Sequence, residues 1–208
     1  MDIHWASKLA AELKNPLPGA GAQLRMAPSA RLPVIAGKSP KKSGVLLLLY
    51  PCDDDIYTVF IKRTEYVGIH SGQISFPGGK FEKHDVTLAN TALREAMEET
   101  GIPVDAAKII GNLTPLTIPV SNTIVFPYVA ICHDRPVFHH DPGEVQYLIE
   151  ARIDDLLNPV NHRTKIMRIA GYKVSVPYID IQNNHIWGAT AMILSEFLEV
   201  VKKVMSDQ

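Results

Sequence analysis

Residues 78–102 read GGKFEKHDVTLANTALREAMEETGI, and they contain the best-marked element of the chain. The second half of this stretch predicts a helix over residues 87–100. Asp85 and Thr87 are both suitable N-cap residues, whereas Gly101, followed by Pro103, is a typical helix stop. A helix with both ends marked in this way is expected to be an ordered part of the fold.

Three carboxylates share one face of this predicted helix. At about 100° per residue, one arc contains Glu95, Glu98 and Glu99. The opposite arc is predicted to face the core and contains Ala89, Leu93, Ala96 and Met97. Like charges at this spacing repel unless a cation or hydrogen bonds compensate. Hard oxygen ligands suit Mg²⁺ or Mn²⁺, and the alternative is a solvated acidic face with Arg94 as its local partner.

A double glycine, Gly78-Gly79, precedes the helix by a short loop. Glycine allows the backbone to approach a phosphate closely or to offer a carbonyl oxygen to a metal ion. This flank favours a metal and phosphate site over a solvated acidic face.

Around this stretch the chain is rich in predicted strands. The runs 45–50 and 57–62 predict a hairpin, and strand-like runs follow at 108–116, 123–132, 146–153, 165–169 and 172–181. A closing helix is predicted over residues 189–204, with apolar side chains along one face. Strands, one helix, more strands and a final helix predict an α+β layered domain over residues 45–208.

The N-terminal segment, residues 1–44, has a different composition. Apolar spacing over residues 3–13 predicts a short amphipathic helix, and the prolines and glycines of residues 15–44 predict an extended connector. Residues 1–44 contain seven basic and two acidic side chains, a net charge of +5, so the remainder carries −6 of the total of −1. We therefore expect a basic, Pro-rich arm in front of an acidic domain.

Composition excludes several classes of protein. The chain of 208 residues is 46% hydrophobic and 21% charged, which is typical of a globular domain. A net charge of −1 provides no global positive field for a nucleic-acid partner. The longest apolar run, residues 45–50, is far shorter than the roughly 20 residues that span a bilayer, and no signal-peptide pattern is present. We expect a cytoplasmic protein with no membrane partner.

The stretch resembles the sequence box of the Nudix hydrolases, which ends in Arg-Glu-x-x-Glu-Glu-x-Gly and an aliphatic residue. The second half matches in full, at Arg94, Glu95, Glu98, Glu99, Gly101 and Ile102. The first half departs from the general pattern, because Asp85 replaces a glutamate and the path from Gly79 to Arg94 is one residue longer. The resemblance implies an α/β/α sandwich with a mixed sheet.

Both departures resemble the branch of the family that acts on coenzyme A. The upstream signature of that branch matches at Arg63-Thr64, Gly72 and Phe76-Pro-Gly-Gly79. Gly68 stands where that signature has an arginine. The alternative substrates are ADP-ribose, nucleotide sugars and dinucleoside polyphosphates, and an alternative of another class is a non-catalytic nucleotide-binding module.

The resemblance also implies roles for the residues of the box. The family hydrolyses nucleoside diphosphate derivatives with a divalent metal, here Mg²⁺ or Mn²⁺, and many of its members are homodimers. The implied metal ligands are Glu95, Glu98, Glu99 and the Gly79 carbonyl oxygen. Arg94 would orient a helix carboxylate, and Asp85 would brace the loop.

The remaining site residues are open between two interpretations. The general base is a helix glutamate such as Glu98, or Glu144, which is otherwise a solvated loop carboxylate. Lys62 and Arg63 would contact phosphates or balance the acidic site from a distance. Phe76 would stack on adenine or pack in the core. The expected substrate-binding residues are Lys62, Arg63, Phe76, Gly78, Gly79 and Lys80.

Overall fold

Strand β1 (Lys41–Cys52) is the central strand of the main sheet. In this computed structural model, which describes residues 3–29, 39–65, 72–169 and 171–206, the apolar run from Leu46 to Tyr50 is fully buried. β1 forms the predicted hairpin with β2 (Asp55–Arg63) and pairs in parallel with β7 (Thr123–Ile131). The sheet is therefore mixed.

Five further strands complete the main sheet. Its order is β3-β2-β1-β7-β5, while β4 pairs with β1, β6 with β7 and β8 with β2. The bounds of these strands are β3 (Ile74–Ser75), β4 (Gly78–Lys80), β5 (Lys108–Asn112), β6 (Leu116–Ile118) and β8 (Val145–Arg152). The strand predicted over residues 108–116 is thus two short strands, and the 123–132 and 146–153 predictions are confirmed.

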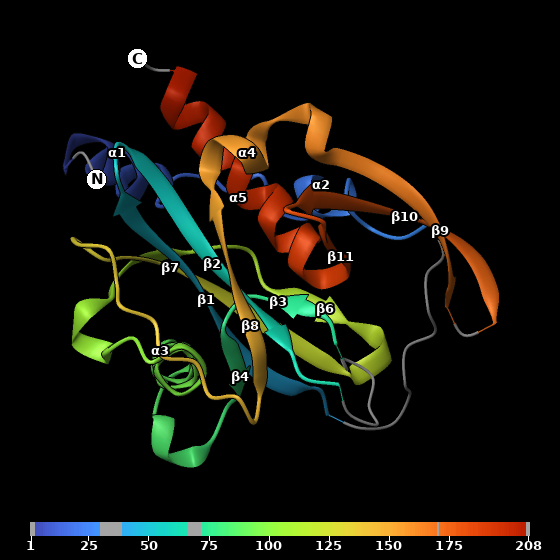
Figure 1. The fold of residues 1–208 in the computed structure, drawn as a ribbon, viewed down its shortest axis with the longest axis horizontal. Coiled ribbons are helices and arrows are strands. Elements are labelled where there is room, and N and C mark those ends of the chain that lie inside the picture. The colour runs from blue at the N-terminus through green and yellow to red at the C-terminus, as the bar shows by residue number, and fades with distance from the viewer. Residues whose placement is uncertain (1–2, 30–38, 66–71, 170, 207–208) are drawn as a thin grey trace.

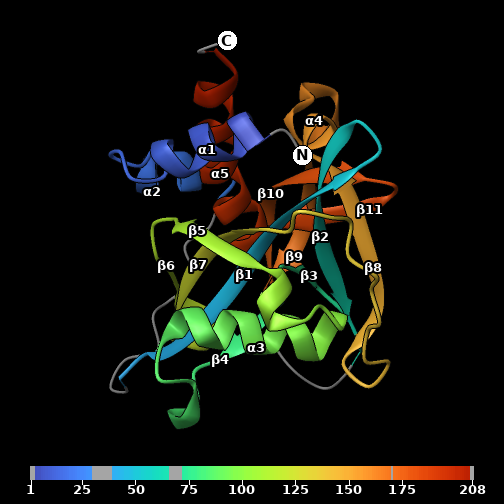
Figure 2. The ribbon, with the colours of Figure 1, turned by 90° about the vertical axis from the view of Figure 1, so that its left-hand side faces the viewer.

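The side chains of β1 alternate between two cores, one on each face of the sheet. Leu46, Leu48 and Tyr50 pack on the face covered by α3 (Leu88–Thr100). Leu47 and Leu49 pack on the other face, which is covered by α1 (Ile3–Glu12), α2 (Gly19–Leu24) and α5 (Gly188–Ser206). Figures 1 and 2 show the sheet between these helices, so the predicted α/β/α layering is confirmed.

A second sheet lies beside the first near the C-terminal helix. It contains three antiparallel strands in the order β11-β10-β9. The elements after β8 are α4 (Ile153–Leu157), β9 (His162–Ile169), β10 (Tyr172–Ile181) and β11 (Asn184–Trp187). β11 contacts β3 of the main sheet and leads directly into α5. The two sheets therefore meet at the end of β2 and β3.

Helix α3 packs unusually close to β1. A Cβ atom at Gly44 of β1 would overlap the carbonyl oxygen of Leu88, so only glycine permits this approach. The ends of α3 are those expected from the sequence, because Thr87 caps Asn90 N at 3.1 Å and Gly101 adopts a φ of 76°. The predicted core face is wrong in part, since Met97 is 41% exposed. The buried side instead includes Ala92, Ala96 and Glu99, which lie at i, i+4 and i+7 on one helical face.

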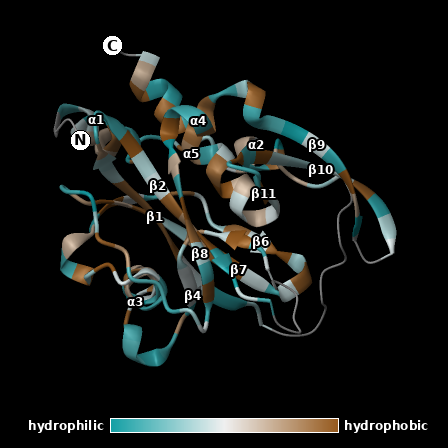
Figure 3. Ribbon diagram, in the orientation of Figure 1, coloured by the Kyte–Doolittle hydropathy of each residue, from teal (hydrophilic) through white to brown (hydrophobic). Residues whose placement is uncertain are grey.

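The N-terminal segment is part of the core. The predicted helix over residues 3–13 is confirmed, and its Trp5 and Leu9 side chains are buried with the apolar face of α5. The prediction of an extended connector is wrong for residues 19–24, which form α2, and for residues 41–44, which belong to β1. The predicted closing helix is confirmed by α5. Figure 3 shows hydrophobic and hydrophilic residues alternating along it.

A buried glutamate of α5 holds the N-terminal segment in place. Glu196 is fully buried and accepts hydrogen bonds from Gln23 Nε2 at 2.8 Å, Gly19 N at 3.1 Å and Thr114 Oγ1 at 2.6 Å. Every donor in this group is neutral, and together they join α2, α5 and the loop between β5 and β6. Among the described ranges, no helix is both long and apolar enough to cross a bilayer.

Candidate active site

The turn at Gly78-Gly79 brings backbone directly against the carboxylate face of α3. Gly78 has a φ of 152°, and a Cβ atom there would overlap the carbonyl oxygen of Gly44. A Cβ atom at Gly79 would overlap the carboxyl group of Glu95. Gly78 is therefore required by the close approach of backbone, whereas a side chain at Gly79 would displace the carboxyl group of Glu95 in the predicted site.

Arg94 joins the loop to the helix. Its guanidinium donates to both carboxylate oxygens of Asp85, at 2.7 and 3.2 Å, to Glu98 at 2.8 Å and to Glu95 at 3.0 Å. It also donates to the Lys80 carbonyl oxygen at 3.3 Å. The contact predicted between Arg94 and the helix carboxylates is therefore present, and a single side chain fixes three carboxylates.

Asp85 is the buried anchor of this network. Its side chain is 1% exposed and accepts further hydrogen bonds from Glu82 N and Thr91 Oγ1, each at 2.8 Å. The Arg94 hydrogen bonds, followed by these donors, hold the pKa of Asp85 well below its usual range despite its burial. Asp85 braces the loop against α3, as the sequence predicts.

Glu99 lies at the base of the site and is almost entirely buried. It accepts hydrogen bonds from Arg63 Nη1 at 3.0 Å and Gly78 N at 2.8 Å, and its side chain is 1% exposed. Burial raises the pKa of Glu99 to about 7, although the Gly78 hydrogen bond and the Arg63 charge act in the opposite direction. The charges of Glu95 and Glu144 add to the increase. Arg63 thus balances the acidic site by direct contact.

The other two carboxylates of α3 are more accessible. The side chain of Glu95 is 15% exposed and that of Glu98 is 51% exposed. Burial raises the pKa of Glu95, opposed by Arg94 and reinforced by the charges of Glu98 and Glu144. The exposed Glu144 is therefore close enough to the site to act on the same carboxylates.

The donor set suits a hard divalent cation in its chemistry. Glu95, Glu98 and Glu99 offer carboxylate oxygens on adjacent turns of one helix, with the backbone of Gly79 beside Glu95. Within the described ranges, no three His, Cys, Asp or Glu side chains are already gathered around one point as a metal site. The three glutamates form ion pairs with arginines instead: Glu95 and Glu98 with Arg94, and Glu99 with Arg63. A bound cation would have to replace the ion pairs that Arg94 makes.

The remaining predicted residues separate into three groups. Lys62 lines a cavity on the far side of Arg63, at the junction of the two sheets. The Lys80 side chain is exposed, at the edge of the turn. Of the two interpretations of Phe76, the structure supports packing in the core, because its side chain is 2% exposed and packs on Phe60, with 4.9 Å between the ring centroids. Gly68 lies outside the described residues.

The sequence did not reveal the other walls of the cavity that Lys62 lines. Lys165 of β9 and Trp187 of β11 line it together with Lys62, although they are more than 100 positions away in the chain. The alternating pattern around Lys165 predicts a strand, and no local signal indicates that this strand lines a cavity together with Lys62 of β2. Only the contact between the two sheets brings these residues together.

Comparisons with known proteins identify the family. The family model of the NUDIX domain matches residues 40–166. Nudix hydrolase 22, chloroplastic, of Arabidopsis thaliana is 35% identical over 78% of this chain and 56% of its own length. The uncharacterized Nudix hydrolase NudL of Yersinia enterocolitica is 31% identical over 76% of this chain and 80% of its own length. The chain thus spans slightly more than half of the Arabidopsis relative.

Solved structures support the same fold. A MutT/nudix family protein of Enterococcus faecalis aligns with a TM-score of 0.53 at 16% identity, covering 83% of this chain and 66% of its own. A MutT protein of Methanosarcina mazei aligns with a TM-score of 0.50 at 15% identity, covering 83% and 98%. The mixed sheet between helices is the Nudix fold, and the chain belongs to the Nudix family.

Proposed function

We propose that this chain hydrolyses the pyrophosphate bond of a nucleoside diphosphate derivative, with coenzyme A or an acyl-coenzyme A as the substrate. Water adds to one phosphorus atom and the bond between the bridging oxygen and that phosphorus breaks. Coenzyme A would yield 4′-phosphopantetheine and adenosine 3′,5′-bisphosphate. The observation that carries the proposal is the pairing of Glu95 and Glu98 with Arg94 and of Glu99 with Arg63, directly beside the Gly78-Gly79 turn.

Nudix hydrolases use divalent metal ions, and α3 provides the ligands for one. We assign Glu95, Glu98 and Glu99 as ligands of Mg²⁺ or Mn²⁺, with the Gly79 carbonyl oxygen as a further ligand. When bound, the cation supplies positive charge to the bridging phosphates and makes water more acidic. Arg94 would then keep its hydrogen bond to Asp85, so the loop would stay attached to α3 after the cation has taken the place of Arg94 at the glutamates.

The protein groups around this site have distinct tasks. Asp85 and Arg94 fix the loop to the helix, so that the Gly79 backbone and the carboxylates of α3 keep their separation. Arg63 holds Glu99 and places a second guanidinium where it can meet a phosphate. Glu98 and Glu144 are the two candidates for the general base, because both are exposed at the site.

Coenzyme A is favoured by the residues upstream of the box. Arg63-Thr64, Gly72 and Phe76-Pro-Gly-Gly79 match the signature of that branch. These residues are neighbours in the fold, since Arg63 N donates to the Gln73 carbonyl oxygen at 3.0 Å and Gly72 N to that of Thr64 at 3.3 Å. The described residues of the signature at the ends of β2 and β3 therefore lie together, and Arg63 among them contacts Glu99.

A second candidate is hydrolysis of ADP-ribose, a nucleotide sugar or a dinucleoside polyphosphate. Gly68, in place of the arginine of the coenzyme A signature, is the specific observation in its favour. A non-catalytic nucleotide-binding module is disfavoured, because the three box glutamates are all present. Calorimetry with Mg²⁺ and Mn²⁺ tests this alternative, because absence of any metal binding would support a non-catalytic module.

A panel of substrates, with identification of the products, distinguishes the two proposed enzyme activities. The protein is incubated with Mg²⁺ and, in separate reactions, coenzyme A, ADP-ribose and diadenosine tetraphosphate, and products are identified by mass spectrometry. We expect 4′-phosphopantetheine from coenzyme A at the highest kcat/KM. Cleavage of ADP-ribose without release of 4′-phosphopantetheine would reject coenzyme A in favour of the second candidate.

A further inference from the structure

A cavity of about 240 Å³ lies between the main sheet and the three-stranded sheet, and Lys62 of β2 is part of its wall. The alternation of side chains along β2 determines the face on which the cavity lies. Phe60 packs in the core beneath α5, whereas Arg63 contacts Glu99 of α3. Because alternate side chains of a strand share a face, Lys62 lies on the side of Phe60. The main sheet therefore separates this cavity from the acidic site.

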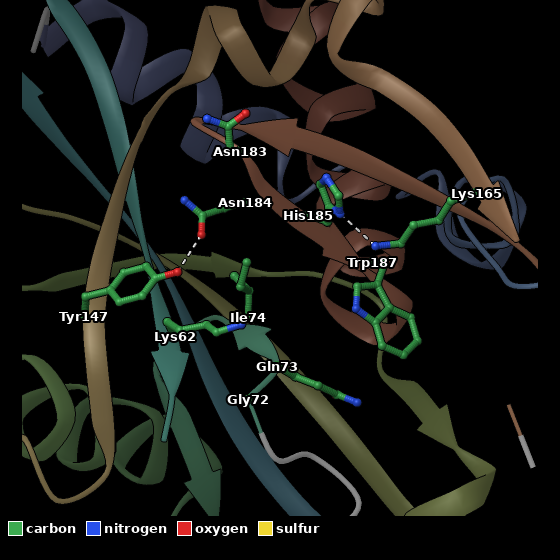
Figure 4. A pocket seen from close by; sticks show the side chains of 10 residues that line it. All are labelled: Lys62, Gly72, Gln73, Ile74, Tyr147, Lys165, Asn183, Asn184, His185 and Trp187. Carbon is green, nitrogen blue, oxygen red and sulfur yellow. Dashed lines mark hydrogen bonds between the residues drawn. The ribbon is translucent and has the colours of Figure 1, made fainter. Parts of the chain in front are cut away.

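Each of the two sheets contributes one wall of the cavity. In the main sheet, Lys62 is directly opposite Tyr147 of β8 and Ile74 of β3, so these three side chains share one face. The other wall includes Lys165 of β9 and Trp187 of β11. Figure 4 shows Lys62 and Lys165 entering the cavity from these two sheets.

Polar contacts of the protein hold both walls in place. Tyr147 Oη donates to Asn184 Oδ1 at 2.9 Å, which joins β8 to β11. Lys165 Nζ lies 2.8 Å from His185 Nδ1 and 4.9 Å from the centroid of the Tyr178 ring. The position of the Lys165 ammonium is therefore defined by its own sheet.

The cavity brings two positive charges together. Its described lining residues include Lys62 and Lys165 and contain no Asp or Glu. Burial lowers the pKa of Lys165, the charge of Asp180 opposes this effect, and the charge of Lys62 adds to the decrease. An anion bound between the two lysines would relieve their repulsion.

The acidic side chains near the cavity do not neutralise these lysines. Asp180 is paired with Arg163 at 3.2 Å. Glu65 lies beside Gly72, and within the described ranges it forms no ion pair with either lysine. No Asp or Glu occurs in the internal stretches outside the described residues, which are 30–38, 66–71 and 170. The counter-charge for the two lysines therefore comes from the solution.

The charged groups of the cavity are hydrogen-bond donors. A lysine ammonium has three N–H donors and no acceptor, so Lys165 keeps two donors beyond the one that faces His185. The half-buried indole of Trp187 adds an N–H group that only donates. Cavities that enclose a whole drug-sized ligand are typically about 300–1,000 Å³. This smaller, donor-rich cavity suits a compact anion with several acceptor oxygens.

We propose that this cavity is a phosphate-binding site, held between Lys62 and Lys165 and separate from the acidic site on α3. A phosphate group carries about two negative charges near pH 7 and presents three or more acceptor oxygens, which matches two ammonium groups. The ligand is inorganic phosphate or the phosphate group of a small monoester. Both sources share this chemistry, and the last experiment below distinguishes them.

The first experiment uses the two tryptophans of the chain as local probes. Trp187 lines the cavity, whereas Trp5 belongs to α1 and serves as the internal control. The ¹⁵N-labelled protein in EDTA, at constant ionic strength, is titrated with sodium phosphate, and Trp187→Phe assigns the two indole N–H signals. We expect a saturable shift of the Trp187 signal with a Kd on the order of 1 mM, and no shift of the Trp5 signal. Absence of a saturable Trp187 shift would overturn the proposal.

The second experiment repeats the titration with lysine variants. Lys62→Met and Lys165→Met keep most of the apolar stem and should each weaken phosphate binding by about tenfold or more. Lys165→Arg, which keeps the charge, should retain binding. Lys173→Met is the matched control, because this exposed lysine of β10 does not line the cavity. Wild-type affinity in either cavity methionine variant, with the Trp5 signal unchanged, would overturn the proposal.

The third experiment compares ligands. Acetate, with one charge and two oxygens, should bind more weakly than phosphate, and equal or tighter binding of acetate would contradict a phosphate site. Ribose 5-phosphate binding as tightly as inorganic phosphate would identify a monoester as the ligand, whereas binding of inorganic phosphate alone would identify the free ion. These measurements involve no hydrolysis, so their outcome is independent of the reaction proposed for α3.

Discussion

Helices α3 and α5 cover opposite faces of the same sheet, and each contains a glutamate that is almost fully buried. Glu99 of α3 is held by a guanidinium and one backbone N–H, with further carboxylates around it. Glu196 of α5 is held only by neutral donors from distant parts of the chain. Burial of a carboxylate therefore does not by itself indicate a reactive site.

The difference lies in what the partners can do. The partners of the α3 carboxylates are charged guanidinium groups, so under the proposed function a bound cation would compete with Arg94 for Glu95 and Glu98. The amide, hydroxyl and backbone donors around Glu196 are fixed by the packing of α2 and of the loop between β5 and β6 on α5. Glu99 therefore belongs to the proposed catalytic site, whereas Glu196 is a structural anchor.

The largest effect is expected from Glu98→Gln, which removes charge from the exposed carboxylate of the α3 site. We expect turnover to fall by roughly 10³-fold for every substrate of the panel, because a metal ligand or general base is lost. The unfolding free energy should change by less than about 1 kcal/mol, since Glu98 is half exposed. Glu199→Gln on α5, which removes a comparable pair with Arg25 at 3.2 Å, is the control and should retain activity. Near-normal turnover of the Glu98 variant would reject the assignment.

The anchor on α5 predicts the opposite pattern. Glu196→Ala leaves the donors of Gln23, Gly19 and Thr114 without an acceptor, so the unfolding free energy should fall by about 3 kcal/mol. Amide hydrogen exchange in α2 should accelerate, while kcat of the folded protein stays the same. Loss of kcat at wild-type stability would show that α5 contributes to the reaction.

Asp85→Asn tests the anchor of the α3 site itself. The substitution weakens the bidentate Arg94 contact and should reduce the unfolding free energy at pH 7 by about 2 kcal/mol. The folded-state pKa of Asp85 lies below the unfolded value of about 3.9, so its contribution is present above that value and is lost as the pH falls toward the folded pKa. Denaturation of both proteins from pH 7 to pH 2 should therefore show the difference shrinking below about pH 4. The exposed Asp105→Asn serves as control, and a difference independent of pH would contradict the ion-pair account.

The smallest effect concerns the turn that leads into α3. Val86 has a φ of 64°, which is strained for a β-branched residue, and its side chain is 79% exposed. Val86→Gly should increase the unfolding free energy by about 0.5–1 kcal/mol, because relief of strain exceeds the entropy cost of glycine. Val160→Gly, also highly exposed but without a positive φ, should be neutral or destabilising. Equal effects at the two positions in chemical denaturation would show that Val86 stores no strain.

The acidic site could largely be predicted from the sequence because its residues are close together in the chain. The box determines the caps of α3, and the spacing of its glutamates and Arg94 is set by the geometry of one helix. The burial of Glu99 and the exposure of Met97 could not be predicted in the same way. They depend on how α3 packs against β1, where Gly44 allows the helix backbone at Leu88 to approach closely.

Long-range packing explains the errors elsewhere. Residues 19–24 contain glycine and follow a proline, so they resemble a connector, yet Glu196 and the apolar face of α5 stabilise a helix there. Phe76 belongs to a motif that favours substrate contact, but its side chain fills the core beside Phe60. The basic cavity was missed because its lysines come from separate sheets. Local sequence patterns predict secondary-structure elements and short motifs, whereas contacts between sheets can be seen only in the folded structure.

The most direct test of the central claim is the stoichiometry of coenzyme A cleavage by the wild-type protein with Mg²⁺, with Mn²⁺ and with EDTA. Mass spectrometry follows both products with time. We predict 4′-phosphopantetheine and adenosine 3′,5′-bisphosphate in equal amounts with either metal, and neither product with EDTA. Intact coenzyme A after incubation with each metal, in a protein sample shown to be folded, would contradict the assignment of the α3 carboxylates to this reaction.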